Sequence, residues 1–520
     1  MKRFVLITLY TLLVLLIISC GGDTGGDAEE DSSQPTSPPV IQSFTASPTY
    51  ATVGGTVTFS WSVTGADTIS IDQGVGEVSS SGTTGVTMDT IGTINFTLTA
   101  TNSAGTETAQ VSIEVNDVSS ETWAITFGDD FHDYGECIQK TSDNNFIVTG
   151  LIRWKPYSFD WQDDVLLMKI DHSGNILWDK KIGGWDDDSG YSVREILNNS
   201  SLKDATNSNG FIITGCTESY GAGWDDVYLV KTDSSGDDKW DKALHGTSSY
   251  DRGLEVQVTS DGNFIVVGYT QMSGSVSDEI YLAKVDPNGN KIWEKIFGGS
   301  KSDYAYSVQE TSDGGFILTG ATYSYGNGGE TDVYLVKTDA NGNKLWQKTF
   351  GGTDSDYGSC VRQISSSSTS VNSAETSGFI IAGFTKSLGA GKWDVYLIKT
   401  NNSGEKVWEK TFGGSEDEKA HCVQQTSDGG FIIVGMTESY GEGEEDIYLI
   451  KTDSSGNKEW EKTIGGSELD YGRWVLEISD GYMIAGNTMS FNAKKNDVFI
   501  IRTDKNGNVD LNSIMHIWNR

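Results

Sequence analysis

Short segments of alternating hydrophobic and polar residues fill most of the chain after residue 40, and no long segment has apolar residues at helical spacing. One stretch shows the pattern clearly, because strands are predicted at AYSVQET (305–311), GFILTGATY (315–323), DVYLVKTD (332–339) and KLWQKTF (344–350). The turns between them, TSDGG, TDANGN and FGG, combine Asp or Asn with a Gly that takes the positive φ of a tight turn. The pattern therefore predicts an all-β protein.

The same four-strand pattern repeats along the chain from residue 121 onward. Its most regular part is the turn between the third and fourth strands, found at IDHSGNILW (170–178), TDSSGDDKW (232–240), VDPNGNKIW (285–293), TDANGNKLW (338–346), TNNSGEKVW (400–408) and TDSSGNKEW (452–460). A seventh copy, TDKNGNVDL (503–511), has Leu511 in place of the Trp. A repeat of roughly 50 to 60 residues with four strands fits the blades of a β-propeller.

The fourth strand that the last repeat lacks is found at the other end of the repeat region. TWAITFG (122–128) has the sequence of a fourth strand, with Trp123 at the position of the repeated Trp. If this strand completes the last blade, strands from both ends of the domain close the ring and leave no exposed edge. The sequence therefore predicts a seven-bladed β-propeller over 121–520, and an open solenoid is the alternative.

The Asp-x-x-Gly-x-x-x-Trp element resembles the tryptophan-docking motif of quinoprotein-like propellers, in which the Trp packs between adjacent blades. The SDGGFIxxGxT pattern also resembles uncharacterised propeller-repeat proteins of bacteria and archaea. Both resemblances concern the fold, and neither implies a cofactor site in this chain. No cofactor is expected.

The first twenty residues have the features of a secretory signal. Lys2 and Arg3 precede an apolar run from Phe4 to Ile18, which is short for a membrane span. The run ends at Ile17-Ile18-Ser19-Cys20, which resembles the lipobox of bacterial lipoproteins, and this resemblance implies lipidation at Cys20 after cleavage. An ordinary secretory signal is the alternative. The lipoprotein interpretation predicts a bacterial cell-envelope protein held outside the cytoplasm on a bilayer, at the outer membrane or cell surface.

Two further segments lie between the signal and the repeats. Residues 21–39 are rich in Gly, Asp, Glu, Ser and Pro, a composition that predicts a flexible tether. Residues 40–117 contain short alternating segments such as TVTFSWSV (56–63) and INFTLTAT (94–101), which predict a small β-sandwich. This segment resembles the immunoglobulin-like or PKD-like modules of bacterial surface proteins, with Trp61 as the expected core residue.

Charge and cysteine content exclude several classes of function. The formal net charge of −36 argues against nucleic acid as a partner, because phosphates need cationic surfaces. Beyond Cys20 there are four cysteines, Cys137, Cys216, Cys360 and Cys422, whose spacing matches no zinc pattern. Three of them occupy one equivalent strand position, which favours a packing role over catalysis. The protein is expected to be a monomer.

Acidic residues recur at two positions of every repeat. The first set stands near the start of the first strand and comprises Asp133, Asp188, Asp251, Asp303, Asp356, Glu418 and Asp470. The second set begins the third strand and comprises Asp164, Asp226, Glu279, Asp332, Asp394, Asp446 and Asp497. Because the first strand of a propeller blade is innermost, the first set is a candidate ligand-binding ring at the channel mouth. The alternative, which strict recurrence favours, is that both sets accept hydrogen bonds from loop N–H groups.

Departures from the repeat indicate where a ligand would bind. The loop between the second and third strands of the first repeat is longer than most of its equivalents and contains Trp154, Tyr157, Phe159 and Trp161. Trp224 and Trp393 occupy equivalent loops in other repeats. Large aromatic residues beside acids suit stacking on sugar rings or anchoring of a protein partner, and packing on a neighbouring blade is the alternative.

No catalytic motif such as GxSxG, HExxH or a P-loop occurs in the chain, so no catalytic residue is assigned. Asp339, Asn341 and Asn343 resemble the start of a calcium loop, but the Gly falls at the fourth position instead of the sixth and no Glu follows at the twelfth. Calcium is considered there and in the acidic loop GEGEED (441–446). The function expected is therefore a non-enzymatic binding module for glycan or protein, with a polysaccharide lyase or hydrolase, or a structural envelope protein, as alternatives.

Overall fold

The computed structural model describes residues 37–47, 49–52, 55–90, 92–116, 122–155, 161–197, 209–222, 224–244, 250–271, 276–326, 330–364, 377–511 and 514–518. The chain divides into two compact units, Met1–Asp117 and Val118–Arg520. Within the described ranges every regular element is a β-strand, which confirms the all-β class. Lipidation at Cys20 and most of the predicted tether lie outside these ranges.

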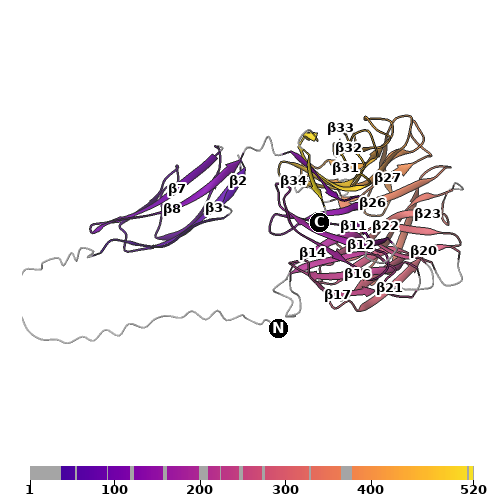
Figure 1. The fold of residues 1–520 in the computed structure, drawn as a ribbon, viewed down its shortest axis with the longest axis horizontal. Helices are drawn as coiled ribbons and strands as arrows, with labels where there is room; N and C mark the ends of the chain where they lie inside the picture. The colour runs from indigo at the N-terminus through magenta and orange to yellow at the C-terminus, as the bar shows by residue number, and fades with distance from the viewer. Residues whose placement is uncertain are drawn as a thin grey trace, which may run out of the picture. The chain divides into compact units, whose positions relative to one another are not determined.

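The first unit contains two sheets around a common core (Figure 1). One sheet has the order β1 (Val40–Ser47), β3 (Thr56–Thr64) and β6 (Ser81–Thr87). The other has the order β2 (Tyr50–Thr52), β8 (Gly105–Asn116), β7 (Gly92–Asn102), β4 (Thr68–Ile71) and β5 (Gly76–Glu77). Alternate residues of β3 and β7 point into the core, where Trp61 packs with Phe59, Phe96 and Leu98, so Trp61 is the core residue expected.

The described residues of the second unit form seven sheets, numbered 1 to 7 in chain order, which are antiparallel except for one strand of sheet 7. Sheet 1 comprises β10 (Asp133–Lys140), β11 (Phe146–Trp154), β12 (Gln162–Ile170) and β13 (Ile176–Ile182). Sheet 2 comprises β14 (Asp188–Ile196), β15 (Gly210–Thr217), β16 (Asp226–Asp233) and β17 (Asp238–Ala243). Sheet 3 comprises β18 (Asp251–Val258), β19 (Phe264–Gln271), β20 (Asp278–Val285) and β21 (Lys291–Phe297). Sheet 4 comprises β22 (Asp303–Glu310), β23 (Phe316–Thr322), β24 (Asp332–Thr338) and β25 (Lys344–Phe350).

The last three sheets continue the same order. Sheet 5 comprises β26 (Asp356–Ile364), β27 (Gly378–Thr385), β28 (Asp394–Thr400) and β29 (Lys406–Phe412). Sheet 6 comprises β30 (Glu418–Gln425), β31 (Phe431–Thr437), β32 (Asp446–Thr452) and β33 (Lys458–Ile464). Sheet 7 comprises β34 (Asp470–Ile478), β35 (Gly481–Thr488), β36 (Asp497–Asp504), β9 (Trp123–Gly128) and β37 (Met515–Trp518).

Sheet 7 joins the two ends of the second unit. β9 pairs antiparallel with β36, with Trp123 opposite Arg502 and Phe127 opposite Val498, so the strand at 122–128 does complete the last sheet. β37 adds a further strand parallel to β9, which the repeat pattern did not predict because residues 515–518 lie outside it.

Neighbouring sheets pack face to face in chain order, and sheet 1 also packs against sheet 7. The first strand of each sheet contacts the first three strands of the preceding one, and β10 contacts β34, β35 and β36 in the same way. The first strands therefore form the innermost ring of the unit, whose sheets follow one another from purple β11 to yellow β33 in Figure 1. In sheet 4, for example, the second and third strands are covered on both faces and buried along their whole length, whereas the fourth strand is partly exposed.

The Trp that recurs in the fourth strand packs on a glycine of the next sheet. This glycine lies in the turn between the third and fourth strands of that sheet. A Cβ added to Gly404, which has φ of +76°, would lie 2.6 Å from the indole of Trp346. The same contact joins Trp408 to Gly456, and Trp123 of β9 lies against Gly174 of sheet 1. The resemblance to tryptophan docking thus extends to the contact itself, and β9 supplies the Trp that sheet 7 lacks.

Candidate functional site

Seven aromatic side chains lie at one end of sheets 3 to 5, where first strands begin and second strands end. We call this group the aromatic surface, and it comprises Tyr269, Tyr304, Tyr306, Tyr323, Tyr357, Phe384 and Trp393. All seven are at least partly exposed. They come from different repeats, so only the packing of one sheet on the next brings them together.

The part of the aromatic surface on sheet 5 is a compact cluster of rings. Tyr357 stacks on Phe384 with ring centroids 5.0 Å apart, and Trp393 meets both rings edge-on, 5.8 Å from Tyr357 and 5.2 Å from Phe384. The ammonium of Lys386 lies 5.8 Å from the centroid of the Trp393 ring. These contacts hold the rings in fixed orientations, which lowers the entropic cost of using them to bind a ligand.

A pocket of about 350 Å³ adjoins this cluster on sheet 4. It is lined by Ser277, Lys301, Ser302, Tyr304 and Tyr323. The hydroxyl of Tyr323 lies 3.3 Å from that of Tyr357, so the pocket is continuous with the rings of sheet 5. Its wall therefore combines aromatic faces with hydroxyl groups and one ammonium.

The tyrosine hydroxyls of the pocket are neutral hydrogen-bonding groups at physiological pH. Tyr304 donates a hydrogen bond of 2.5 Å to Oδ2 of Asp278, and burial together with this bond raises the pKa of Tyr304. The hydrogen bond with Tyr357, followed by burial, raises the pKa of Tyr323 to about 12. Both hydroxyls therefore stay protonated and can exchange hydrogen bonds with a neutral ligand.

The long loop of the first repeat contributes a separate aromatic cluster. Trp161 is 50% exposed and packs on Phe131 with ring centroids 4.5 Å apart, and Lys155 lies 4.8 Å from its centroid. Trp154 is half-buried, donates to the carboxylate of Asp164 and is covered by Lys181, so it has a packing role. Tyr157 and Phe159 lie outside the described residues.

Trp224 and Trp393 were also predicted as ligand-binding residues. Trp393 belongs to the aromatic surface, and Trp224 is not part of it. Trp224 is 60% exposed and stacks with Tyr250 at 6.2 Å. Trp185, in the loop between sheets 1 and 2, is 91% exposed and was not predicted as a site residue.

The first acidic set, considered as a candidate ligand-binding ring at the channel mouth, presents no exposed carboxylate. All seven side chains are 0% exposed, namely Asp133, Asp188, Asp251, Asp303, Asp356, Glu418 and Asp470. Asp470, for example, accepts hydrogen bonds of 2.8 Å from the backbone N–H of Gly466 and from the hydroxyl of Ser490. The alternative interpretation, in which recurrent acids accept hydrogen bonds from loop groups, agrees with these contacts.

The two acidic sets meet across the glycine that follows each fourth strand. A Cβ added to Gly465 would lie 2.0 Å from Oδ1 of Asp446 and 2.7 Å from Oδ2 of Asp470. Equivalent pairs over other turn glycines are Asp497 with Asp133, Asp164 with Asp188, Glu279 with Asp303, Asp332 with Asp356, and Asp394 with Glu418. Asp226, the remaining member of the second set, is 1% exposed and accepts a hydrogen bond from the N–H of Ala222. Only a residue without a side chain fits between such carboxylates.

Burial and mutual repulsion shift the protonation of these pairs. Burial, reinforced by neighbouring acids that include Asp497, raises the pKa of Asp133 to about 7. Burial and the nearby charge of Asp129 raise the pKa of Asp497 to about 7 as well. Burial and the charge of Asp446 raise the pKa of Asp470 to about 6. Asp133, Asp497 and Asp470 therefore hold protons at a pH where exposed carboxyls are ionised.

The turns considered for calcium are organised by their own hydrogen bonds. Asp339 Oδ1 accepts from the N–H groups of Asn341 and Asn343, and Oδ2 accepts from the Asn343 amide, at 2.8 to 2.9 Å. Among the described residues, no group of three or more His, Cys, Asp or Glu side chains has an arrangement that could hold a metal ion. Calcium binding stays a prediction.

Most of the aromatic surface was missed from the sequence, although a signal exists. Tyr304 and Tyr357 each follow the acid that begins a first strand, and Tyr269 and Phe384 each precede the Thr near the end of a second strand. The position after the acid is also Tyr in repeats 1 and 7, at Tyr134 and Tyr471, so aligning the repeats would have singled out repeats 3 and 5 only at the second of these positions.

In the part of the chain that the structure describes, no helix is both long and apolar enough to cross a lipid bilayer. No protein-family model matches the sequence, and no curated protein matches it either.

Among solved structures, the Pan2 WD40 domain of Neurospora crassa is 12% identical, with a TM-score of 0.41 over 72% of this chain and 91% of that one. Sqt1 of Chaetomium thermophilum is also 12% identical, with a TM-score of 0.38 over 73% of this chain and 97% of that one. A quinoprotein alcohol dehydrogenase-like protein of Bacteroides thetaiotaomicron is 11% identical, with a TM-score of 0.33 over 82% of this chain and 97% of that one. These likenesses, to proteins of WD40 and quinoprotein-like description, assign no activity to this chain.

Proposed function

We propose that this protein is a lipid-anchored surface protein whose second unit, a seven-bladed β-propeller, binds neutral glycans through the aromatic surface without catalysing a reaction. The observation that carries the proposal is the continuity of the pocket beside Tyr304 and Tyr323 with the ring cluster of Tyr357, Phe384 and Trp393.

The chemistry of the aromatic surface suits a sugar polymer. Aromatic faces stack on the C–H faces of pyranose rings, and the hydroxyls of Ser277, Ser302, Tyr304 and Tyr323 match the hydroxyls of a sugar. The formal net charge of −36 disfavours polyanionic ligands, so a neutral glycan is the best match. The rings extend over three sheets, which favours an extended ligand over a single small molecule.

The lining of the pocket argues for binding rather than hydrolysis. Glycosidases use two carboxyl groups beside the scissile bond, whereas none of the described residues that line this pocket is an Asp or Glu, and the adjacent carboxylate of Asp278 accepts the hydrogen bond of Tyr304. The acids of the first set, which suggested an enzyme, are fully buried, where no polysaccharide reaches them.

Three features support the rest of the proposal. Closure of the ring by β9, the contact of sheet 1 with sheet 7 and the recurring Trp–Gly contact are what a propeller of seven blades requires. The first unit, with two sheets over one core, is proposed as an immunoglobulin- or PKD-like spacer. The lipobox-like sequence at Cys20 supports the anchor, and palmitate labelling that is absent from a Cys20→Ser variant would test it.

The test of the glycan proposal uses the full chain purified in mild detergent. It is screened on a glycan array, and the affinity for the best neutral glycan is measured by titration calorimetry. Trp393→Ala should weaken binding about tenfold, because a stacked ring contributes on the order of 1 to 2 kcal/mol. Tyr323→Ala should have a similar effect.

The matched control is Trp185→Ala, which removes an exposed indole far from the pocket in sequence and should leave the affinity unchanged. If no glycan binds, or if Trp393→Ala binds as well as wild type, the proposed site is wrong. Loss of binding in Trp185→Ala or in a Trp161→Ala variant alone would move the site to sheets 1 and 2.

A further inference from the structure

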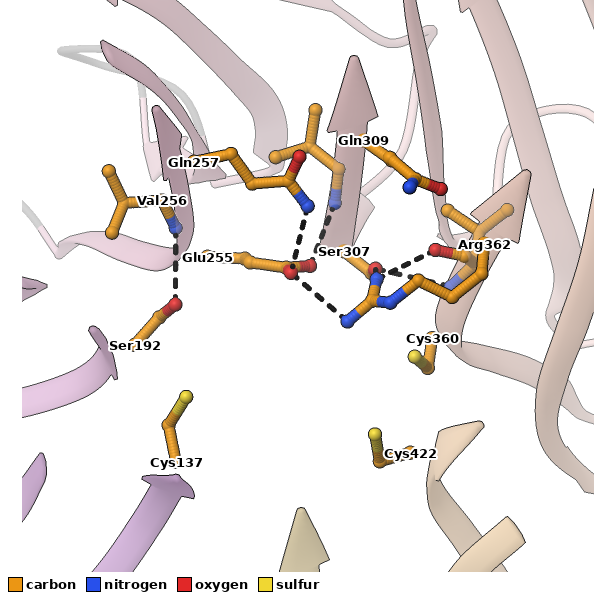
Figure 2. A network of polar contacts seen from close by, with 12 residues as sticks. Cys137, Ser192, Glu255, Val256, Gln257, Ser307, Gln309, Cys360, Arg362 and Cys422 are labelled. Atoms are coloured by element: carbon orange, nitrogen blue, oxygen red, sulfur yellow. Dashed lines mark hydrogen bonds and ion pairs between the residues drawn. The ribbon is translucent and has the colours of Figure 1, made fainter. Parts of the chain in front are cut away.

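The innermost strands carry a ring of side chains that breaks the symmetry of the repeat. Every first strand has a register shift after its third residue, for example between Gly358 and Cys360. The residue after each shift belongs to this ring, whose members are Cys137, Ser192, Glu255, Ser307, Cys360, Cys422 and Trp474. Figure 2 shows six of them around the centre of the second unit.

Arg194 and Arg362 lie beside this ring. Each stands two residues after a ring member on the same strand. Arg194 donates to Oε1 of Glu255 at 2.7 Å, and Arg362 donates to the same oxygen at 3.2 Å. Both guanidiniums also lie against the ring of Trp474, at 5.0 and 5.3 Å from its centroid. One carboxylate thus faces two cations, which leaves excess positive charge near the neighbouring thiols.

Cys360 and Cys422 are the two adjacent thiols of the ring. They come from the neighbouring first strands β26 and β30, at equivalent positions directly after the register shift. The Cys360 sulfur lies 3.7 Å from the carbonyl oxygen of Val423, the residue that follows Cys422. Both are free thiols and are 2% and 0% exposed, and Figure 2 shows them together below Arg362.

The environment of Cys360 favours its thiolate form. The neighbouring Cys422 thiol and the charge of Arg362 lower the pKa of Cys360 below its ordinary value, even though burial acts in the opposite direction. Cys216, which lies outside the ring, has its pKa raised to about 12 by burial. Nucleophilicity towards oxidants depends on the thiolate, so these two buried cysteines are expected to differ in reactivity.

We propose that Cys360 and Cys422 are an oxidisable dithiol that small peroxides convert to a disulfide between sheets 5 and 6. The sulfur of Cys360 attacks one peroxide oxygen, the O–O bond breaks, and water leaves after protonation, so that Cys360 becomes a sulfenic acid. The sulfur of Cys422 then attacks the sulfur of Cys360, the S–O bond breaks, and a second water leaves with the proton of the Cys422 thiol. Two thiols are oxidised by two electrons and one hydrogen peroxide is reduced to two waters.

Cys137 provides an internal comparison within the same ring. Its sulfur lies 3.5 Å from Nη1 of Arg194, so it too has a guanidinium beside it. Its neighbours around the ring are Ser192 and Trp474, which supply no second thiol. Cys137 therefore has no neighbouring ring thiol with which it could form a disulfide.

The test treats the folded full-length chain with hydrogen peroxide, blocks free thiols with N-ethylmaleimide after denaturation, and maps the digest by mass spectrometry. The expected product is one linked peptide pair containing Cys360 and Cys422, while Cys137 and Cys216 are recovered mainly as maleimide adducts. In Cys422→Ser, dimedone should trap a sulfenic acid at Cys360, formed at least about tenfold faster than any modification of Cys216.

A Cys137→Ser variant is the matched control and should form the Cys360–Cys422 link as wild type does. The proposal is overturned if both cysteines are recovered as maleimide adducts after treatment. It is also overturned if links to Cys137 or Cys216 are as abundant as the Cys360–Cys422 link, because that pattern reports oxidation of unfolded chain. The mapping of wild type needs no substitution, so a variant that fails to fold leaves the result intact.

Discussion

The indole Nε1 of Trp123 donates a hydrogen bond to the carbonyl oxygen of His172, 3.1 Å away and on a different sheet. Trp240 makes the equivalent bond to the carbonyl oxygen of Pro287 at 3.2 Å. In both cases the accepting carbonyl belongs to the residue that follows an Asp, and this Asp opens the turn between the third and fourth strands of its sheet. A residue near the start of the second unit therefore makes the contact that a repeat Trp makes elsewhere, and this contact joins sheet 7 to sheet 1.

Replacement of Trp123 should destabilise the second unit strongly. Trp123 is 7% exposed and packs in the core between sheets 7 and 1, so Trp123→Ala should lower the free energy of unfolding by about 3 to 5 kcal/mol. Urea unfolding followed by tryptophan fluorescence and circular dichroism measures the change. Trp185→Ala, which removes an indole that is 91% exposed, should change the free energy by less than about 0.5 kcal/mol. Equal effects of the two variants would contradict a role in closure.

The Trp–Gly contact predicts unequal effects of two glycine substitutions. Gly404 has φ of +76° and lies under Trp346, whereas Gly429 has φ of +87° and no heavy atom within 4 Å of an added Cβ. Both Ala variants are strained by the positive φ at a cost of about 1 kcal/mol. Gly404→Ala should lose about 1 to 3 kcal/mol more, because the methyl group overlaps the indole. Thermal unfolding compares the two variants. Indistinguishable midpoints would show that the Trp346 side chain moves away from the added methyl group with no loss of stability.

The paired acids predict how stability depends on pH. The pKa values of Asp133 and Asp497 are about 7 in the folded protein, above their ordinary value of 3.8. Between these values the folded state binds protons that the unfolded chain releases, so the free energy of unfolding falls as the pH rises from about 4 to 7. Asp497→Asn removes one carboxylate and should raise the free energy of unfolding at pH 8 by about 2 kcal/mol, with little change at pH 4. Denaturant titrations at both pH values measure this.

Asp428 is the control with the opposite sign. Its hydrogen bond to Lys451 and other contacts outweigh burial and lower its pKa to about 2, so its stabilising effect is present above pH 3.8 and is lost as the pH falls towards 2. Asp428→Asn should therefore reduce stability at pH 8 and leave it nearly unchanged at pH 2. If Asp497→Asn and Asp428→Asn shifted stability in the same direction at pH 8, the assignment of the paired acids would be wrong.

Neutralisation of Glu255 should lower the free energy of unfolding, because two arginines beside it lose their counter-charge. Glu255 is buried, and the charges of Arg362 and Arg194 lower its pKa despite burial. Glu255→Gln leaves two buried guanidiniums without a counter-charge and should lower the free energy of unfolding by about 3 to 5 kcal/mol at pH 7. Glu405→Gln, which breaks an exposed pair with Lys348, should cost less than about 1 kcal/mol. Chemical denaturation of the two variants tests the difference.

Local patterns carried most of the information about the elements of this fold. The alternation of apolar residues, the Asp-Gly turns and the repeat length predicted four strands for each repeat, because turn chemistry and side-chain alternation depend on nearest neighbours. The missing Trp at Leu511 and the extra one at Trp123 identified the strand that crosses to the last sheet, and the pairing of β9 with β36 agrees. β37 was not foreseen, because it follows no repeat.

The candidate site depended on contacts between repeats. The acids of Asp446 and Asp470 are far apart in sequence and meet only because one sheet packs on the next over Gly465. The same packing buried the acids that were expected at the channel mouth, and it joined Tyr323 to Tyr357 and Cys360 to Cys422. The amino-acid sequence alone determined the strands, the turns and the pairing of the chain ends. The packing of the sheets decided which side chains are exposed, which acids lie close enough to shift one another's pKa and which rings form one surface, because burial and charge depend on neighbours from other repeats.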